Sequence, residues 1–267
     1  MTTRRNFVKM AGASGLICIA APLHAQHRLN IGIGTFSYHD LSIDDMILQL
    51  NALRIREIEM SRGEFMLLSH PHDDLFRSAR AKLDRAGIRC VSYYAATIKD
   101  DGDVEDAVRF AKLLGSGNIT GDGTESVLKR IDRRLTQEGL TFGLHNHFFP
   151  NATFAYRGPD EVLQAIHGLS RTMGATADTG QFASCGYDPV DAVRKLAPRL
   201  RMVHLKDVKA RGSDVNVLLG AGVARIPAVM QELRRQNFAG LVAVEYEKEG
   251  DVDRDMAKEI AFARKLA

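Results

Sequence analysis

The sequence predicts an α/β fold, a single (β/α)8 TIM barrel with eight parallel strands. The chain has 267 residues, close to the roughly 250 that are typical of one such barrel, and no linker-like tract follows Ala25. Strand-like apolar runs alternate with helical patterns about eight times, as repeated βα units do. Four of the later apolar runs end in a side chain that can bind a metal. Parallel barrel strands bring such ends to one mouth.

Eight short apolar runs are the expected strands, each followed by a helical pattern. The strands are expected at 29–36, 55–60, 88–94, 118–121, 140–147, 172–178, 200–206 and 240–246. The helices are expected at 43–53, 75–86, 104–114, 125–138, 159–166, 189–196, 226–236 and 253–266. The fourth unit is the weakest because its strand is short.

Start and stop signals support these helices. Expected N-caps are Ser42 and Asp103, and expected first-turn prolines are Pro159, Pro189 and Pro227. Glycines expected to end helices in a left-handed conformation are Gly87, Gly139 and Gly240. Two glycine pairs, at 121–123 and 220–222, are interpreted as a turn and a loop; the second could also touch a substrate.

The first 25 residues are interpreted as an export signal. Arg4 and Arg5 are followed by Phe7 and then by an apolar run, which resembles a twin-arginine signal. The run is shorter than the about 20 residues that a membrane span needs, so an anchor or a short buried helix is the weaker interpretation. We expect residues 1–25 to be removed and residues 26–267 to be periplasmic or secreted, with no membrane attachment.

Composition narrows the classes of partner. The net charge of +3 falls to about neutral when the basic residues of the signal leave, which gives no support to nucleic-acid binding. Cys90 and Cys185 are the only cysteines after the signal, so we expect buried thiols and no disulfide framework.

Four side chains form the pattern of a metal centre: His145, Asp178, His204 and Glu245. Each ends an apolar run, and they are too far apart in the sequence for a local finger. Consecutive barrel strands could bring them together at the mouth, which predicts a metal site and an enzyme. The plainer alternatives are a loop cap for Asp178, a core histidine for His204 and a surface carboxylate for Glu245.

Two more side chains follow predicted ligands at a spacing of two, His147 after His145 and Lys206 after His204. Residues i and i+2 share a face of a strand, so both should face the mouth. His147 is the expected base, because imidazole titrates near neutrality, and Lys206 is expected to stabilise an oxyanion. With Glu245 they are the predicted catalytic residues.

Three side chains are expected to contact the substrate. Glu59 ends the second strand and could reach the mouth from the opposite side. Glu247 stands two residues after Glu245, with a solvated rim as the alternative. Asn146 points away from its neighbours in a regular strand, so it would contact substrate only at a bulge or a strand end.

The chain resembles the sugar-phosphate isomerase/epimerase family with the xylose isomerase-like TIM barrel. The matching segments are LLGSGNITG (113–121), GLHNH (143–147), ADTGQ (177–181), VHLKD (203–207), LGAGV (219–223) and GLVAVEYE (240–247). The resemblance implies a divalent ion, often Mn²⁺, held by Glu, Asp, His and Glu at the ends of strands five to eight. Asp178, His204 and Glu245 match, whereas His145 stands where the sugar epimerases carry Glu.

Two histidines and two carboxylates suit Mn²⁺, Co²⁺, Fe²⁺ or Zn²⁺ better than Mg²⁺, so we expect one divalent transition metal, with Mn²⁺ first.

The resemblance implies isomerisation or epimerisation of a non-phosphorylated keto sugar, through proton removal beside a carbonyl and an enediolate stabilised by the ion. A 3-keto-glycoside lyase acting by β-elimination is the first alternative. A carbohydrate-binding barrel without catalysis is the second. An endonuclease is disfavoured because a basic groove and the extra ligands are missing. A homo-oligomer could cover the short fourth unit.

Overall fold

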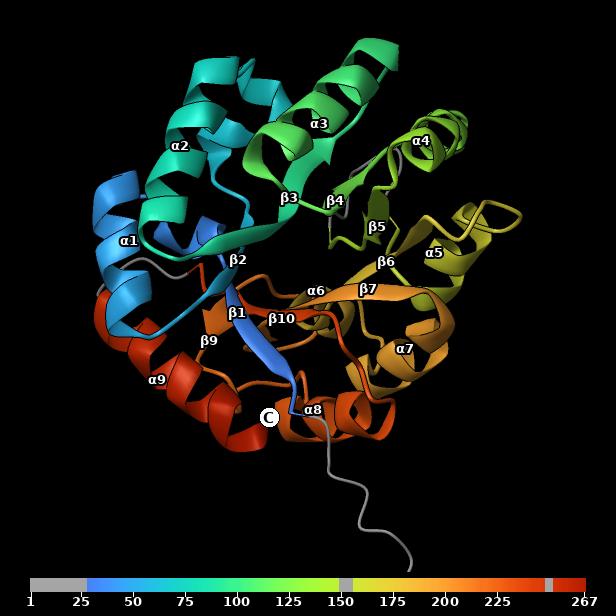
Figure 1. Ribbon diagram of the computed structural model, residues 1–267. Helices are drawn as coiled ribbons and strands as arrows, with labels where there is room; N and C mark the ends of the chain where they lie inside the picture. Colours follow the sequence, from blue (N-terminus) through green and yellow to red (C-terminus); the bar gives the residue numbers. More distant parts are fainter. Residues whose placement is uncertain (1–27, 149–155, 248–251) are drawn as a thin grey trace, which may run out of the picture.

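The computed structural model describes residues 28–148, 156–247 and 252–267. The expected export signal at 1–25 lies outside these ranges. Within them the main sheet is a closed barrel of parallel strands in the order β1-β10-β7-β6-β5-β4-β3-β2 (Figure 1). The predicted fold class, a single eight-stranded parallel barrel, is confirmed.

The barrel strands all overlap the predicted runs. They are β1 (Asn30–Gly34), β2 (Glu57–Met60), β3 (Arg89–Thr97), β4 (Asn118–Asp122), β5 (Thr141–His145), β6 (Met173–Asp178), β7 (Leu200–Leu205) and β10 (Leu241–Val244). Two very short strands, β8 (Asp207–Val208) and β9 (Asn216–Val217), form a separate antiparallel pair in the loop after β7. No pattern in the sequence predicts this pair.

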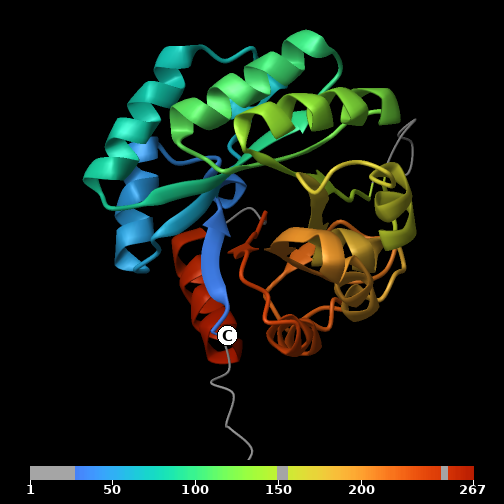
Figure 2. The same cartoon turned by 45° about the vertical axis from the view of Figure 1, so that its right-hand side comes forward.

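The helices surround the barrel. They are α1 (Ile43–Ala52), α2 (Asp73–Arg85), α3 (Asp101–Leu114), α4 (Glu125–Glu138), α5 (Pro159–Ala165), α6 (Thr179–Ser184), α7 (Pro189–Leu196), α8 (Ile226–Arg235) and α9 (Val252–Leu266). Short 3₁₀ turns occur at η1 (Thr35–Tyr38), η2 (Gly63–Phe65), η3 (Leu67–Ser69) and η4 (Ala197–Arg199). Figure 2 shows α9 beside β1, so the last helix covers the first strand, where β10 closes the ring. Among the α-helices in the described ranges, α6 is the one that the sequence did not predict.

The helix starts agree with the sequence in all but one case. Ser42 caps α1 by accepting a hydrogen bond from the Asp45 amide at 3.1 Å. Prolines occupy the first turns of α5, α7 and α8, as predicted. Asp103 is not the cap of α3: Asp100 is, and it accepts from the Asp103 amide at 3.0 Å. The helix therefore begins a few residues earlier than the apolar pattern does.

Two of the three predicted stop glycines are left-handed, Gly87 at φ 66° and Gly139 at φ 69°. Gly240 is not, because Asn237 at φ 52° makes the left-handed turn after α8. Gly240 is instead required by close packing, since a Cβ there would lie 2.2 Å from the carbonyl oxygen of Arg201.

Strand alternation divides the barrel into two compartments. Outward residues such as Val203 and Leu205 on β7 pack under the helices in the main apolar core. Inward residues at the base form a small apolar plug of Met202, Leu241 and Ala243. Further up, the inward residues are polar, so the chemistry of the chain is concentrated inside the upper half of the barrel.

A buried hydroxyl layer crosses the middle of the barrel. Ser92 on β3 lies 3.2 Å from Thr120 on β4, and Thr120 lies 3.1 Å from Thr176 on β6. Strand β5 runs between these last two strands and carries Gly143 at this level, where a Cβ would come within 2.1 Å of the Thr176 hydroxyl. The glycine lets the hydroxyls meet across β5.

The remaining general expectations concern thiols and membranes. Cys90 is buried as predicted, whereas Cys185 is partly exposed, and both are free thiols. None of the helices in the described ranges has the length and apolarity to cross a membrane.

Candidate metal centre

Three of the four predicted ligands form one buried cluster at the carboxyl ends of neighbouring strands. His145 ends β5, Asp178 ends β6 and His204 is the penultimate residue of β7, and their ligand atoms lie within 4.8 Å of one another. His145 Nε2 is 2.9 Å from His204 Nδ1, and Asp178 Oδ2 is 3.8 Å from the first and 4.0 Å from the second. The barrel thus brings together residues that are far apart in the sequence.

The two carboxylate oxygens of Asp178 have different surroundings: one caps a helix and the other faces the cluster. Its Oδ1 accepts from the Gln181 amide at 2.8 Å and caps α6, so the interpretation as a cap is correct for this oxygen. Its Oδ2 is buried and has no hydrogen-bond partner among the described residues. A buried unpaired carboxylate oxygen is costly, and a cation beside it removes that cost.

Glu245 offers a candidate fourth donor, a carboxylate oxygen. It follows β10, and its Oε2 lies 3.6 Å from His204 Nδ1. Gly34 at the end of β1 leaves the space for it, since a Cβ there would lie 3.3 Å from Glu245 Oε1. Atoms bound to one ion at about 2.1 Å lie roughly 3 to 3.5 Å apart, so His145, Asp178 and His204 need only small shifts to hold a divalent metal, with Glu245 beside His204 as the candidate fourth ligand.

The charges in the cluster also fit a cation. Burial, and then the proximity of His147, His204 and Lys206, holds the pKa of His145 well below its usual value, so its imidazole is neutral and can act as a ligand. Burial raises the pKa of Glu245 to about 7, against the opposing effect of His204 and Lys206. Burial lowers the pKa of His204, but the nearby carboxylates, led by Glu245 and Glu59, raise it overall to about 10. A bound metal would displace the protons that these raised pKa values place on His204 and Glu245.

Glu59 lies below the cluster and not at the open mouth. Its side chain is 0% exposed, its Oε2 is 2.6 Å from His204 Nε2, and its Oε1 accepts from the Ser92 hydroxyl at 2.9 Å. A carboxylate on the far nitrogen of a ligand histidine fixes the ring and its tautomer. This buried position gives no support to the expected contact of Glu59 with substrate and places Glu59 to orient His204.

Asn146 is also withdrawn from the mouth. Its side chain points away from those of His145 and His147, as the strand alternation predicts, and it is fully buried. It donates to the Asp178 carbonyl at 3.1 Å and accepts from the Asp178 amide at 2.8 Å. Asn146 therefore ties the end of β5 to the end of β6, and the expected contact with substrate does not follow from its position.

His147 faces the mouth, as predicted, and has an acidic neighbour that sequence reasoning missed. Its Nε2 lies 2.9 Å from Asp122 Oδ2 and 3.1 Å from His145 Nδ1. The interpretation of residues 121–123 as a turn is wrong, because Gly121 and Asp122 belong to β4. The alternation of Asn118, Thr120 and Asp122 on one face of that strand was the signal that could have identified the residue.

Lys206 and Glu247 meet at the rim. Lys206 is 2% exposed, and its Nζ donates to Glu247 Oε1 at 2.5 Å and lies 3.8 Å from Glu245 Oε2. Burial lowers the pKa of Lys206, but Asp178, Glu245 and Glu247 together raise it above its usual value. The amine is therefore a fixed positive charge beside the cluster.

Tyr94 is a second residue that the sequence did not single out. Its ring lies 5.6 Å from that of His145 and 6.4 Å from that of His204, and it lines the same cavity. Burial, followed by the nearby carboxylates, raises its pKa well above the ordinary value, so the phenol is neutral. Tyr94 closes the predicted third strand, but a tyrosine at a strand end carries no signal of chemistry by itself.

These residues open into one cavity of about 670 Å³ at the mouth of the barrel. Its walls include every predicted metal ligand together with His147, Lys206, Glu247, Asp122 and Tyr94. The glycines at 220 and 222 do not line it. The Asp207 carboxylate holds that loop by accepting from their amides at 2.9 and 3.0 Å.

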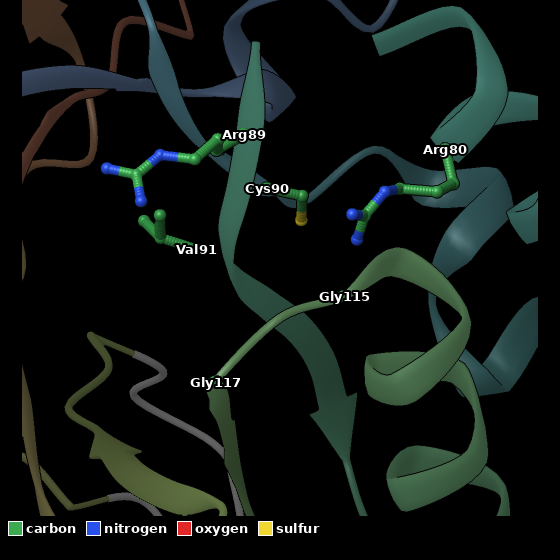
Figure 3. A pocket seen from close by; sticks show the side chains of 6 residues that line it. All are labelled: Arg80, Arg89, Cys90, Val91, Gly115 and Gly117. Atoms are coloured by element: carbon green, nitrogen blue, oxygen red, sulfur yellow. The ribbon is translucent and has the colours of Figure 1, made fainter. Parts of the chain in front are cut away.

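Another cavity, of about 310 Å³, lies at the other end of β3 and β4 (Figure 3). Arg80 and Arg89 flank Cys90 there, but both guanidinium groups have partners. Arg80 binds the Asp84 carboxylate and the Leu114 carbonyl oxygen, which completes the end of α3, and Arg89 pairs with Glu57. The guanidinium groups of this cavity thus serve the fold, whereas the cavity at the mouth contains the predicted ligands and is the candidate functional site.

Comparisons with known proteins agree with the fold. Residues 122–266 match the model of a family described as Xylose isomerase-like TIM barrel. No curated protein matches the chain.

Several solved structures are similar over nearly their whole length. A D-tagatose 3-epimerase-like protein is 17% identical with a TM-score of 0.71, and the match covers 89% of this chain and 97% of that one. The 3-keto-D-glucoside 4-epimerase YcjR from E. coli is 13% identical with a TM-score of 0.72, covering 89% and 100%. An IolI protein with a bound zinc atom is 14% identical with a TM-score of 0.69, covering 89% and 96%. Identities this low show a shared fold.

Proposed function

The chain belongs to the xylose isomerase-like TIM barrel family, and from that premise we propose that it is a divalent-metal-dependent sugar isomerase or epimerase. Its substrate would be a non-phosphorylated keto sugar, and the reaction would start with proton removal next to the carbonyl. The observation that carries the proposal is the buried cluster of His145, Asp178 and His204 beside the His147–Asp122 pair. The similar 3-keto-D-glucoside 4-epimerase and D-tagatose 3-epimerase-like protein support the choice of substrate class.

The residues fit a division of work. His145, Asp178, His204 and Glu245 would hold the ion, which when bound would stabilise negative charge developing on a substrate oxygen. His147 would accept the substrate proton on Nδ1, because its ring lines the cavity and its Nε2–H would donate to the Asp122 carboxylate 2.9 Å away. Asp122 would keep that ring oriented.

Lys206 and Glu247 would act at the opposite edge of the metal cluster. The buried ammonium group of Lys206 is held by Glu247 at 2.5 Å, so it offers a fixed positive charge to a substrate oxygen. Glu245 lies between Lys206 and His204, and it could return a proton on the face opposite His147.

The test is incubation of the metal-loaded protein with ketoses and 3-keto-glycosides in D₂O, followed by NMR and mass spectrometry. Deuterium at the α-carbon of an intact, rearranged sugar is the expected result. H147Q should abolish the exchange while it retains the metal. Exchange that persists at the wild-type rate in H147Q would remove His147 as the base.

β-Elimination from a 3-keto-glycoside is the second candidate, and the observation that favours it is His145. A histidine replaces the carboxylate that would pair with Glu245, so a symmetric pair of carboxylate bases is missing from this metal cluster. An elimination needs one base beside the carbonyl and an exit for the leaving group. Loss of the aglycone in the same D₂O experiment would establish it, whereas metal binding with neither reaction would favour a carbohydrate-binding barrel.

The metal, the location and the assembly are proposals of the same kind. We propose Mn²⁺ as the first choice, with Co²⁺, Fe²⁺ and Zn²⁺ as the tested alternatives in a reconstitution series. Export through the twin-arginine route predicts a protein in the periplasm that begins after Ala25, which mass spectrometry of that fraction would test. Light scattering would test for a homo-oligomer.

A further inference from the structure

We propose that one wall of the mouth is a preformed apolar surface that binds the aromatic aglycone of a glycoside while the sugar lies on the metal cluster. This inference rests on the proposed function and makes the substrate more specific. The wall consists of Phe36, Met66, Leu68 and Phe148, all of which line the cavity that contains the metal ligands. We call these four residues the apolar wall.

Most of the apolar wall comes from the β1–β2 side of the barrel. Phe36 follows β1, and Met66 and Leu68 follow β2, whereas Phe148 follows β5. In the barrel order, two strands separate β2 from β5 on one side and from β7 on the other, and β1 pairs directly with β10, which precedes Glu245. A ligand that contacts Met66 or Leu68 as well as the ends of β5 and β7 therefore spans the mouth.

The segment that carries Met66 and Leu68 is anchored from beneath. The alternating residues Phe65 and Leu67 are buried, and the Phe65 carbonyl oxygen accepts from the Tyr93 hydroxyl at 2.7 Å. Met66 and Leu68 are thus presented by two short 3₁₀ turns with buried supports, so little ordering is required when a ligand binds.

The size of the cavity indicates more than a single sugar ring. Its volume of about 670 Å³ lies in the middle of the roughly 300 to 1,000 Å³ that drug-sized ligands occupy. One sugar on the metal cluster would leave the apolar wall uncovered. A flat aromatic ring would cover it and would gain the transfer free energy of apolar burial.

The charge of the cavity excludes an anionic substituent. Its lining carboxylates are Asp122, Asp178, Asp214, Glu245 and Glu247, and its one lysine is Lys206. Even after a divalent ion binds, the formal charge of these walls stays negative with neutral histidines. A phosphate or carboxylate on the substituent would be repelled, so the second part of the ligand carries no negative charge.

One exposed leucine is common on a protein surface and does not by itself indicate a binding site. A second exposed leucine in this chain serves as a control for Leu68. Leu48 on α1 is 65% exposed and Leu68 is 60% exposed. Leu68 differs because it lines the cavity with three other apolar residues, whereas Leu48 lies on the outer face of a helix.

The experiment compares phenyl and methyl 3-keto-β-glucopyranosides with the Mn²⁺-loaded wild type, the double variant M66S/L68S and the control L48S. Binding is measured by the Mn²⁺-induced broadening of ligand NMR signals, and turnover is measured separately. We expect the wild type and L48S to prefer the phenyl glycoside by roughly tenfold or more. In M66S/L68S the preference should fall to near unity.

Equal binding of the two glycosides by the wild type, or an undiminished preference in M66S/L68S, would contradict the proposal that the apolar wall binds the aglycone. The proposed chemistry is judged by turnover alone. A phenyl preference that depends on Met66 and Leu68, without turnover of either glycoside, supports the wall and contradicts the isomerase proposal. Turnover without any phenyl preference does the reverse.

Discussion

Asp178 shows how single residues serve both the fold and the site. One of its oxygens caps α6 and the other is buried without a hydrogen-bond partner among the described residues. Sequence reasoning treated the cap and the metal ligand as alternatives. A carboxylate has two oxygens, however, and the first turn of a helix takes only one of them, so the cap and the proposed ligand role are compatible.

The His147–Asp122 contact gives the first residue-scale prediction. D122N keeps the shape of the side chain but removes the charge that orients His147, so kcat should fall about 10- to 100-fold with little change in KM. Metal content should stay at the wild-type value. Steady-state kinetics and metal analysis check this, with D214N as the matched control in the same cavity. Equal losses in both variants would show a general charge effect and no specific role for Asp122.

The contact between Glu59 and His204 gives the second residue-scale prediction. It holds the far nitrogen of His204 at 2.6 Å, so E59Q should weaken metal affinity about 10- to 100-fold. Glu57 lies on the same face of β2 near the base, where it binds Asn30 and Arg89, and E57Q should leave the affinity unchanged. Competition with a chelating dye measures both. The same affinity in both variants would mean that Glu59 does not position His204.

At the scale of elements, α9 is joined to the loop after β9 by a buried carboxyl group. Glu259 is 1% exposed, and both of its oxygens accept from the Leu219 amide at 3.1 Å. Burial raises its pKa from 4.5 to about 7, with smaller contributions from Asp207 and Asp255 and an opposing one from the Leu219 amide. The folded state therefore binds a proton that the unfolded chain has released between these two values.

The contribution of Glu259 to stability should thus fall as the pH rises from about 4.5 through 7. At about 1.4 kcal/mol per pK unit, the loss approaches about 3 kcal/mol. E259Q keeps an oxygen for the Leu219 amide and does not ionise, so it should be more stable than the wild type at pH 8 and not at pH 4.5. Urea unfolding at both pH values measures this. A difference independent of pH would contradict the assignment.

The elements that sequence reasoning missed share a physical cause. The strands and long helices have periodic apolar patterns, and those patterns predicted them well. Helix α6 has six residues, and β8 and β9 have two each, which is too short for a period to be visible. Asp122 was not identified because the glycines on both sides of it suggested a turn. The alternation of inward and outward residues along β4 nevertheless continues through Asp122.

The sequence predicted those site residues whose positions depend on the order of the strands. It did not predict how deep in the barrel, or in which direction, individual side chains would lie. The ligands at 145, 178, 204 and 245 follow from the ends of consecutive strands, and the structure brings them together. Glu59 and Asn146 also end strands, but one is buried beneath His204 and the other turns toward the β6 backbone. Depth inside a barrel depends on stagger and packing, which no local pattern encodes.

For the whole molecule, the metal cluster joins three neighbouring strands and should stabilise the closed barrel. An ion present at 100 times its Kd adds about 2.7 kcal/mol, which corresponds to a rise in Tm of roughly 5 to 10 °C for a chain of this size. Chelation should lower the Tm of the wild type by that amount. D178N retains the cap of α6 but loses the ligand oxygen, so chelation should leave its Tm unchanged. An equal response from both proteins would place the stabilising ion elsewhere.

The most direct measurement of the central claim is an anomalous difference map from a crystal of the metal-loaded protein, collected at the absorption edge of the ion. We predict one strong peak within bonding distance of His145 Nε2, Asp178 Oδ2, His204 Nδ1 and a Glu245 oxygen. A peak at another place, or an empty cluster in which His145 and His204 remain hydrogen-bonded to each other, would contradict the metal centre and the chemistry proposed from it.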